Sequence, residues 1–308
     1  MKRAKTHIHR SRSNLIFDIV NDAIMVLVFL IMLYPIWFVI IASVSEPSSV
    51  AQGKVILWPD GFTWYSYINV FEAKKIWIGY RNSIFYTVAG TLLNLALTIP
   101  AAYTLSKKQL PGRKWLSLIF VFTMYFGGGM IPTYINMKNL HLLDSPLTLV
   151  IVGGLSVYNM IICRTYFQNS IPNDLYEAAT IDGASQFQQF FKIALPLSGP
   201  ITAVIALYYA VGRWNEYYNA LIYLNNKNLM PLQMVLRDVL INGQQLLDEV
   251  IADPNSTLEE LAEASRNVYM AEGMKYAVIF VSALPMLLIY PFIQKYFVKG
   301  VMIGSVKE

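Results

Sequence analysis

The residues best placed for chemistry in this chain lie in one polar segment, residues 176–200, between two long apolar blocks. Glu177 and Asp182 give this segment an acidic edge, and Lys192 is its one basic residue. Carboxylates in such a setting form charge-assisted hydrogen bonds with the basic groups of a partner. The segment therefore predicts a recognition site for a basic protein surface.

Residue types used for catalysis and metal binding are few and scattered. The single cysteine, Cys163, excludes a disulfide framework and a cysteine-based metal site. His7, His9 and His141 form no cluster, and the first two would bind a metal only weakly. No GxxxxGK[ST] stretch indicates ATP binding. We expect no catalytic residue, no bound cofactor, no metal site and no nucleic-acid partner.

The composition predicts which elements position the polar segment. Of 308 residues, 56% are apolar and 14% are charged, against about 25% charged in soluble domains. Six stretches without Asp, Glu, Lys or Arg are long enough to cross a bilayer; they are 23–45, 82–106, 115–137, 145–163, 193–212 and 276–294. Because lipid accepts only helices or closed barrels, and barrel alternation is missing, we expect an all-α polytopic membrane protein with six helices. The fifth and sixth helices extend to about 197–224 and 274–298.

Lys and Arg gather in three regions: the tail 1–22, the connection 107–114 and the C-terminal tail. Six spans place these regions on one side, so both termini are expected in the cytoplasm. The apolar run after the basic tail is too long for a signal peptide and is interpreted as a retained first helix. The acidic connection 221–273 and the segment 46–77 are then outside.

The polar segment itself predicts a helix–turn–helix knob. Gly183 ends the first helix at positive φ, Ser185 and Gln188 form a capping box for the second, and the second ends at Leu195–Pro196. The residues expected to share one face are Leu175, Ala178, Ala179 and Asp182 in the first helix and Phe187, Phe190, Phe191 and Ala194 in the second. An alternative is a segment lying on the membrane surface, but such helices usually carry Lys and Arg.

The stretch EAATIDGASQFQQFFKIALPL resembles the cytoplasmic EAA-loop motif of binding-protein-dependent ABC importer permeases; its matching positions are Glu177, Ala178, Ala179, Gly183, Ile193 and Pro196. Residues 81–114, 130–151, 214–224 and 294–308 are similar to the carbohydrate-uptake branch, in the subunit like the maltose permease G protein. The likeness covers about residue 35 to the C-terminus. The acidic insert 242–272 departs from the maltose type and is similar to the subgroup serving complex or acidic oligosaccharides.

The resemblance implies a complex in the cytoplasmic membrane of a prokaryote. Its partners would be a second homologous permease, two ATPase subunits that use ATP and Mg²⁺, and an extracellular solute-binding protein that delivers an oligosaccharide. The knob, as loop 170–196, would be the coupling helix, with Glu177 paired to a basic ATPase residue. The residues implied in coupling are Tyr176, Glu177, Ala178, Ala179, Asp182, Gly183, Phe187 and Phe191.

A second group of residues is a candidate translocation path or gate. Arg213 and Glu216 are spaced i,i+3 near the outer end of the fifth span, where they are expected to pair; snorkelling to the interface is the alternative. The glycine run 127–129 is expected to bend or break the third span, as a hinge or as part of the path lining, or to permit tight helix packing. The candidates are Arg213, Trp214, Asn215, Glu216, Tyr209, Gly128 and Tyr134. The insert contacts the binding protein or the mouth of the path, or it is a mobile loop.

Two other classes of function compete with an ABC permease. A secondary transporter or channel, not coupled to ATP, predicts buried acids within the spans or paired broken helices. A membrane enzyme predicts convergent catalytic groups. The spans lack charge except near Arg213 and Glu216, and no internal repeat is evident, so the ABC permease is favoured.

Overall fold

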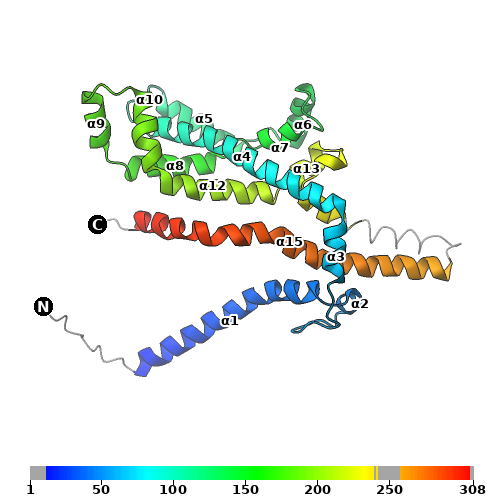
Figure 1. Ribbon diagram of the computed structural model, residues 1–308. Helices are drawn as coiled ribbons and strands as arrows, with labels where there is room; N and C mark the ends of the chain where they lie inside the picture. Colours follow the sequence, from blue (N-terminus) through cyan, green and yellow to red (C-terminus); the bar gives the residue numbers. More distant parts are fainter. Residues whose placement is uncertain (1–11, 239–240, 242–256, 306–308) are drawn as a thin grey trace. The chain divides into compact units, whose positions relative to one another are not determined.

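The computed structural model describes residues 12–238, 241 and 257–305, and the regular elements within these ranges are helical. The chain divides into two compact units (Figure 1). Unit 1 comprises Met1–Val70 and Asn242–Phe280, and unit 2 comprises Phe71–Ile241 and Val281–Glu308. The expected all-α class is confirmed over the described residues.

Unit 1 contains α1 (Arg12–Ser43), α2 (Pro47–Ala51), most of α3 (Tyr65–Glu72) and the first half of α15 (Leu258–Ser305). Nearly all the large apolar side chains of α1 are exposed, and only 6% of its most apolar window is buried. A helix that is apolar all round and unburied is stable only in lipid or against other helices. A hydrophobic core cluster of unit 1 lies where α1 ends and includes Ile41 and Val50.

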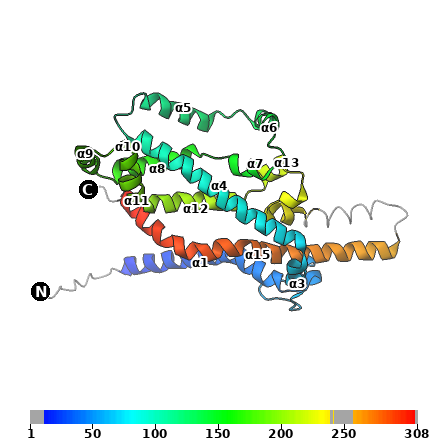
Figure 2. The same ribbon diagram turned by 45° about the horizontal axis from the view of Figure 1, so that its top comes forward.

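Unit 2 is built around the long helix α4 (Lys74–Ser106), which packs along α12 (Gly199–Trp214) and α8 (Val157–Asn169). Its largest core cluster joins these helices through Ile99, Met160 and Ile205. The remaining helices are α5 (Arg113–Tyr125), α6 (Met130–Asn139), α7 (Pro146–Ile151), α9 (Asn173–Ile181), α10 (Gln186–Gln189), η1 (Phe190–Ala194), α11 (Leu195–Leu197), α13 (Tyr218–Tyr223) and η2 (Lys227–Leu229). Both views place α9–α11 at one end of α4 and α6, α7 and α13 towards the other (Figures 1 and 2).

By length and composition, three described helices are apolar enough to cross a membrane: Asn14–Ser43, Lys74–Ser106 and Ala262–Ile289. The number rises to five if each bent pair counts as one span. One pair is α5 with α6, which meet at 108°, and the other is Gln186–Leu197 with α12, which meet at 77°. The glycine run between α5 and α6 does break the third expected helix. A Cβ at Gly127 or Gly129 would meet no atom within 4 Å, so close packing inside the chain does not explain it.

Several expected spans differ in continuity from the sequence prediction. The fourth, 145–163, is two short helices, α7 and α8, separated by residues 152–156 with Gly153 at φ 71°. The fifth, 197–224, is interrupted between α12 and α13. Hydrogen bonds described below stabilise the chain at both breaks. The apolar content of the sequence does not reveal these hydrogen bonds.

Helix α15 is longer than the expected sixth span because its 48 residues include the end of the acidic insert. At 1.5 Å per residue it is about 72 Å long, and about 20 residues cross the hydrocarbon. Helix α15 is therefore longer than the hydrocarbon core of a bilayer is thick. Residues 242–256 of the insert and residues 1–11, which include His7 and His9, lie outside the described residues.

Candidate functional site: a helical knob and a buried arginine network

The first half of the knob is α9, and its end is a hydrogen-bonded turn. Asp174 lies in the first turn of α9, where the helix dipole favours a negative charge. At the other end Gly183 has φ 77°, its N–H donates to Thr180 O (3.0 Å), and the N–H of Ala184 donates to Ala179 O (2.8 Å). This is a Schellman motif, which requires the left-handed residue that glycine supplies. The expected positive φ of Gly183 after the first knob helix is confirmed.

The second half begins with the expected capping box. Ser185 N–H donates to Gln188 Oε1 (2.8 Å), and Gln188 N–H donates to Ser185 Oγ (3.3 Å). The expected helix end at Leu195–Pro196 is wrong. The chain continues through the π-helical turn η1 into α11, and the break follows at Ser198. Because Pro196 has no N–H to donate, the wider turn before it accommodates the proline inside the helical segment.

The knob is attached to the core of unit 2 by its inner side. Phe190 and Ala194 are buried in the main core cluster, and the ring centroids of Phe190 and Tyr103 lie 5.0 Å apart. The buried amide of Gln189 donates to Thr180 Oγ1 (3.0 Å) and to Ala184 O (3.3 Å). The two arms of the knob are thus held to each other and to α4.

A contact that the sequence analysis did not identify joins α9 to the end of α4. The ammonium of Lys107 lies 3.0 Å from the ring centroid of Tyr176 and 4.6 Å from that of Tyr103. These are cation–π contacts. Burial lowers the pKa of Lys107 to about 8. Burial, with Tyr103 nearby, raises the pKa of Tyr176 to about 12. A basic residue directly after a span is an ordinary interfacial signal, so nothing in the sequence marked this contact.

The outer side of the knob exposes large apolar side chains. Ile181 is 86% exposed, Phe187 78% and Phe191 58%. The expected single apolar stripe is therefore split, because the core covers only Phe190 and Ala194. On α9, three of the four residues expected to share a face, Leu175, Ala178 and Asp182, are exposed, whereas Ala179 is buried.

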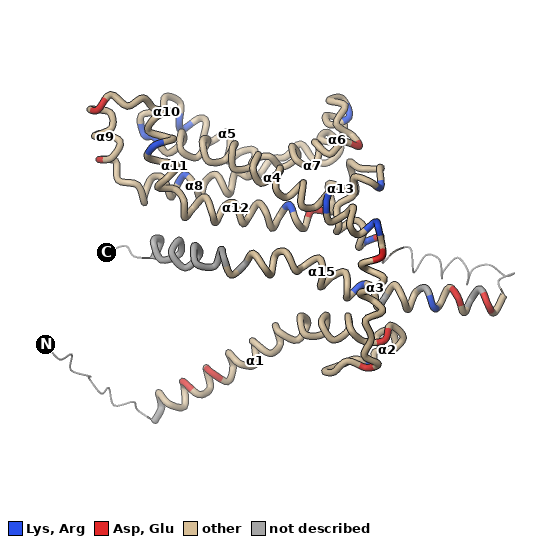
Figure 3. The backbone as a smooth tube through the Cα atoms, viewed as in Figure 1, with Lys and Arg blue, Asp and Glu red and all other residues tan. Residues whose placement is uncertain are grey.

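A cavity of about 780 Å³ is lined by residues of α9 and α10 and of the α4–α5 connection. Lys107, Lys108 and Arg113 line one wall, and Tyr176 and Glu177 line another. Figure 3 shows Lys and Arg gathered at this end of unit 2, with acidic residues on α9. Glu177 and Ile181 thus line a cavity shared with the basic α4–α5 connection, and Phe187 and Phe191 are not among its lining residues.

The second candidate site is a buried network around Arg213. This side chain is 7% exposed. Its Nε–H donates to Asn94 Oδ1 (3.1 Å), and its terminal nitrogens donate to the carbonyls of Leu149 (2.5 Å), Val152 (2.8 Å), Val150 (3.2 Å) and Gly153 (3.2 Å). A guanidinium has five N–H groups, so all are used.

The network explains how the fourth span is broken without unpaired backbone groups. The carbonyls that Arg213 binds belong to the end of α7 and the following turn, where a helix leaves acceptors unsatisfied. Asn94 adds donation from its amide nitrogen to Gly153 O (2.8 Å) and Gly154 O (2.7 Å). At Gly90 a Cβ would lie 2.8 Å from Arg213 Nε, so the guanidinium requires glycine there.

The expected pair of Arg213 with Glu216 is not formed between these two described residues. Glu216 Oε1 instead accepts the N–H of Asn219 (3.2 Å) at the start of α13. The guanidinium is directed to the end of α7 and the turn after it, because four backbone carbonyls converge there. Arg213 therefore binds backbone within the chain and does not snorkel.

The other path candidates are distributed between core and surface. Tyr209 is buried, and its hydroxyl bonds to Thr98 Oγ1 (2.7 Å) and accepts the N–H of Ser156 (3.0 Å). Trp214 is buried and donates to Ser282 O (2.9 Å). The remaining candidates lie outside the core: Asn215 bonds to Val211 O (3.0 Å), Gly128 lies in the α5–α6 break, and the ring of Tyr134 stacks on Tyr223 at 6.2 Å.

Comparisons with known proteins agree on one family. The family model described as "Binding-protein-dependent transport system inner membrane component" matches residues 76–303. Protein LplC of Bacillus subtilis is 39% identical over 97% of both chains. The polygalacturonan/rhamnogalacturonan transport system permease protein YtcP of the same organism is 40% identical over 96% of this chain and 99% of its own. A chain in the crystal structure of a bacterial ABC transporter involved in import of the acidic polysaccharide alginate has a TM-score of 0.82 and 36% identity, over 94% of this chain and 99% of that one.

Proposed function

We propose that the knob, now defined as the helical segment 173–197 (α9, α10, η1 and α11), is the surface that binds an ATPase subunit. The proposal starts from the family, because this chain belongs to the binding-protein-dependent transport system inner membrane components. The chain is a permease subunit of an ATP-driven oligosaccharide importer and is not an enzyme. The family works with ATPase subunits and a solute-binding protein. The coupling surface within this chain is the proposal.

The observation that carries the coupling role is the exposure of Ile181, Phe187 and Phe191 on one short, well-anchored segment. Large apolar groups cluster on a surface where another protein covers them. Glu177 and Asp182 lie beside them and fit a basic rim on the partner. Anchored apolar groups with an acidic edge fit a groove in a protein better than a membrane surface.

The anchorage of the knob supports the transmission of force. Phe190 and Gln189 hold α10 to the core, and Lys107 holds α9 to the end of α4 through Tyr176. A displacement of the knob would then move α4 and α12 as packed elements. At the other end of α4, Arg213 joins α12 to the α7–α8 break. We propose that this rigid path carries ATPase motion toward the translocation path.

We propose six spans with both termini in the cytoplasm of a prokaryote. The bent pair α5–α6 counts as one span, α12 with α13 as another and α7 with α8 as a third, beside α1, α4 and α15. The distribution of Lys and Arg supports this orientation. A second homologous permease and two ATPase subunits complete the complex, and ATP with Mg²⁺ binds to those subunits and not to this chain.

We propose an acidic oligosaccharide as the substrate class. One relative is named for polygalacturonan/rhamnogalacturonan transport, and the similar solved structure concerns import of alginate. Both relationships exceed 35% identity and cover nearly all of this chain. A carboxylate-bearing sugar chain is the chemistry that the two have in common.

The coupling proposal is tested by crosslinking in the assembled complex. A Phe187→Cys variant in a Cys163→Ala background, reconstituted with all partners, is expected to crosslink to an ATPase subunit and to lose the crosslink when ATP moves that subunit. Tyr158→Cys, on α8 and 58% exposed, is the control at a distant surface. Crosslinks from Tyr158 but none from Phe187 would refute the coupling role.

A further inference from the structure

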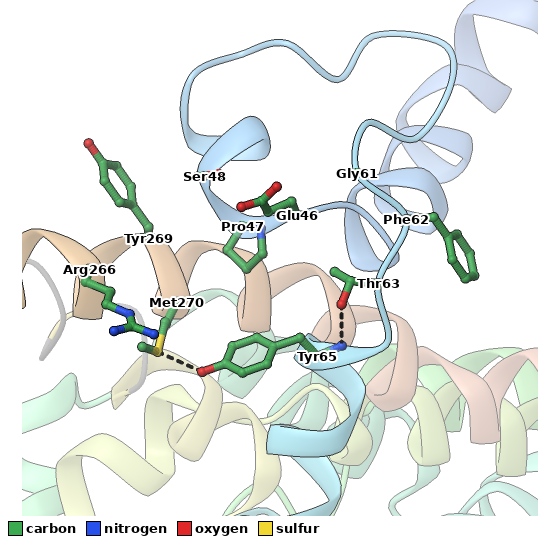
Figure 4. A pocket seen from close by; sticks show the side chains of 10 residues that line it. All are labelled: Glu46, Pro47, Ser48, Gly61, Phe62, Thr63, Tyr65, Arg266, Tyr269 and Met270. Carbon is green, nitrogen blue, oxygen red and sulfur yellow. Dashed lines mark hydrogen bonds between the residues drawn. The ribbon is translucent and has the colours of Figure 1, made fainter.

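Unit 1 holds a cavity of about 480 Å³, and none of the candidate coupling or path residues is among the residues that line it. Its volume lies in the range of small-molecule sites. The residues that line it come from the turn before α2, the segment before α3, and α15 (Figure 4). They include Glu46, Ser48, Thr63, Tyr65, Arg266 and Tyr269.

The cavity walls are fixed by close packing and backbone bonds. At Gly273 of α15 a Cβ would lie 2.7 Å from Pro47 and 3.1 Å from Ser66 Oγ, so the helix lies directly on the cavity wall. Glu46 N–H donates to Asp60 O (3.0 Å), and Thr63 N–H donates to Val44 O (2.8 Å). The cavity is therefore formed before any ligand arrives, which reduces the entropy cost of binding.

One wall of the cavity carries a cation beside aromatic groups. Arg266, Tyr269 and Met270 are spaced i, i+3 and i+4 and thus share a face of α15. The hydroxyl of Tyr65 lies 3.0 Å from the sulfur of Met270, which holds the phenol against this face. Arg266 is exposed, and no ion pair joins it to a carboxylate among the residues that the structure describes. Figure 4 shows its side chain on the side of α15 that faces Tyr65.

The opposite wall carries groups suited to hydroxyls. Glu46 lines it with an exposed carboxylate, and Ser48 adds a hydroxyl. Thr63 Oγ1 accepts the N–H of Tyr65 (3.1 Å), and a hydroxyl that accepts one hydrogen bond can still donate its own proton. A ligand with one carboxylate and several hydroxyls satisfies both walls, because the guanidinium binds a carboxylate with two parallel hydrogen bonds and the Glu46 carboxylate accepts from hydroxyls.

We propose that this cavity is a subsite for one hexuronate unit of the oligosaccharide, with its carboxylate on Arg266, its hydroxyls toward Glu46 and its ring against Tyr65 and Tyr269. The inference rests on the proposed acidic substrate and on the proposed orientation. That orientation places α2, the start of α3 and the start of α15 outside the membrane. The subsite then receives the sugar chain on the side where the binding protein releases it.

The test uses the complete complex in proteoliposomes, with the binding protein saturating and ATP inside. Uptake of a uronate trisaccharide is compared with uptake of the same trisaccharide after its carboxyls are reduced to alcohols. Arg266→Gln is expected to lower the uronate-to-neutral uptake ratio about tenfold, since a hydrogen-bonded charge is lost. Arg266→Lys should recover part of the ratio. Lys54→Gln, which removes an exposed charge of unit 1 outside the cavity, should change nothing.

A second measurement reads binding without transport. A photoreactive uronate trisaccharide is expected to label the peptide that contains Arg266 and Tyr269 in the wild-type complex and not in Arg266→Gln. An unchanged ratio with unchanged labelling would overturn the subsite. If Arg266→Gln lowers the uptake of both sugars equally and also weakens binding of the solute-binding protein, the subsite would be overturned, and the cavity would instead contact the solute-binding protein. Wild-type uptake of the neutral sugar alone would instead refute the acidic substrate, and the subsite with it.

Discussion

Replacing Arg213 by methionine tests the interpretation of the buried network most directly. The substitution keeps a long apolar stem but removes all five N–H donors, which leaves Asn94 Oδ1 and four carbonyls near α7 without that partner. Hydrogen bonds between membrane helices contribute about 0.6 kcal/mol each on average, so the five amount to about 3 kcal/mol. A buried acceptor left without a donor costs about 1–3 kcal/mol, which is the same order of magnitude.

The free energy of unfolding of Arg213→Met is therefore expected to fall by about 3 kcal/mol, which changes the folding equilibrium more than about 100-fold. Reversible denaturation in mixed micelles, followed by circular dichroism, measures it. The free energy of unfolding of Arg213→Lys should lie between those of the wild type and Arg213→Met, because lysine keeps the charge at the end of α7 but has only three N–H donors.

Arg81→Met is the matched control, because Arg81 is exposed and its terminal nitrogen makes a long bond of 3.4 Å to Asn82. If the free energy of unfolding falls no more in Arg213→Met than in Arg81→Met, the structural role of Arg213 is refuted. A changed sugar preference with unchanged stability would show that the guanidinium acts on the path.

Three further predictions concern the knob. Glu177→Lys should abolish ATP-dependent uptake in proteoliposomes, whereas Glu72→Lys, an equal charge change at an exposed site of α3, should not; equal loss in both would contradict pairing at the knob. Gly183→Val should lower the free energy of unfolding by about 1–2 kcal/mol, because valine is strained at the left-handed φ of this position. It should also weaken the stimulation of the ATPase by the loaded binding protein, whereas Gly183→Asn should retain most of that stimulation. Unchanged stimulation in Gly183→Val would show that the bend is not needed. Lys107, with a pKa near 8, should react with amine reagents at pH 8 well before Lys108 in a mass-spectrometric assay. Between about pH 8 and 10.5 the Lys107 side chain is protonated in the unfolded chain and largely deprotonated in the folded chain. Lys107 therefore makes the free energy of unfolding rise with pH in this range. Equal reactivity of Lys107 and Lys108 would refute the burial of Lys107.

The local features of the knob were predictable because short-range chemistry determines them. Gly183 ends α9 at positive φ, and Ser185 with Gln188 caps α10, as their residue types and spacing require. The run of apolar residues without charge likewise determined α1 and α4 as helices able to cross a membrane. The recognition of the family rested on the same kind of contiguous pattern.

What the sequence did not reveal depends on contacts between distant segments. The partners of Arg213 come from α4 and the α7–α8 break, 60 or more positions away, so spacing alone indicated Glu216 instead. Tyr176 meets Lys107 only because α9 folds back on the end of α4.

The sequence by itself determined the membrane class, the helical elements and the turn of the knob, since hydrophobicity and backbone preference act over a few residues. Only the tertiary structure decided which knob side chains face outward, where the fourth span breaks, and which groups line the Arg266 cavity. The reason is that burial and pairing of polar groups depend on which helices meet, and several arrangements of the same apolar helices satisfy the same local preferences.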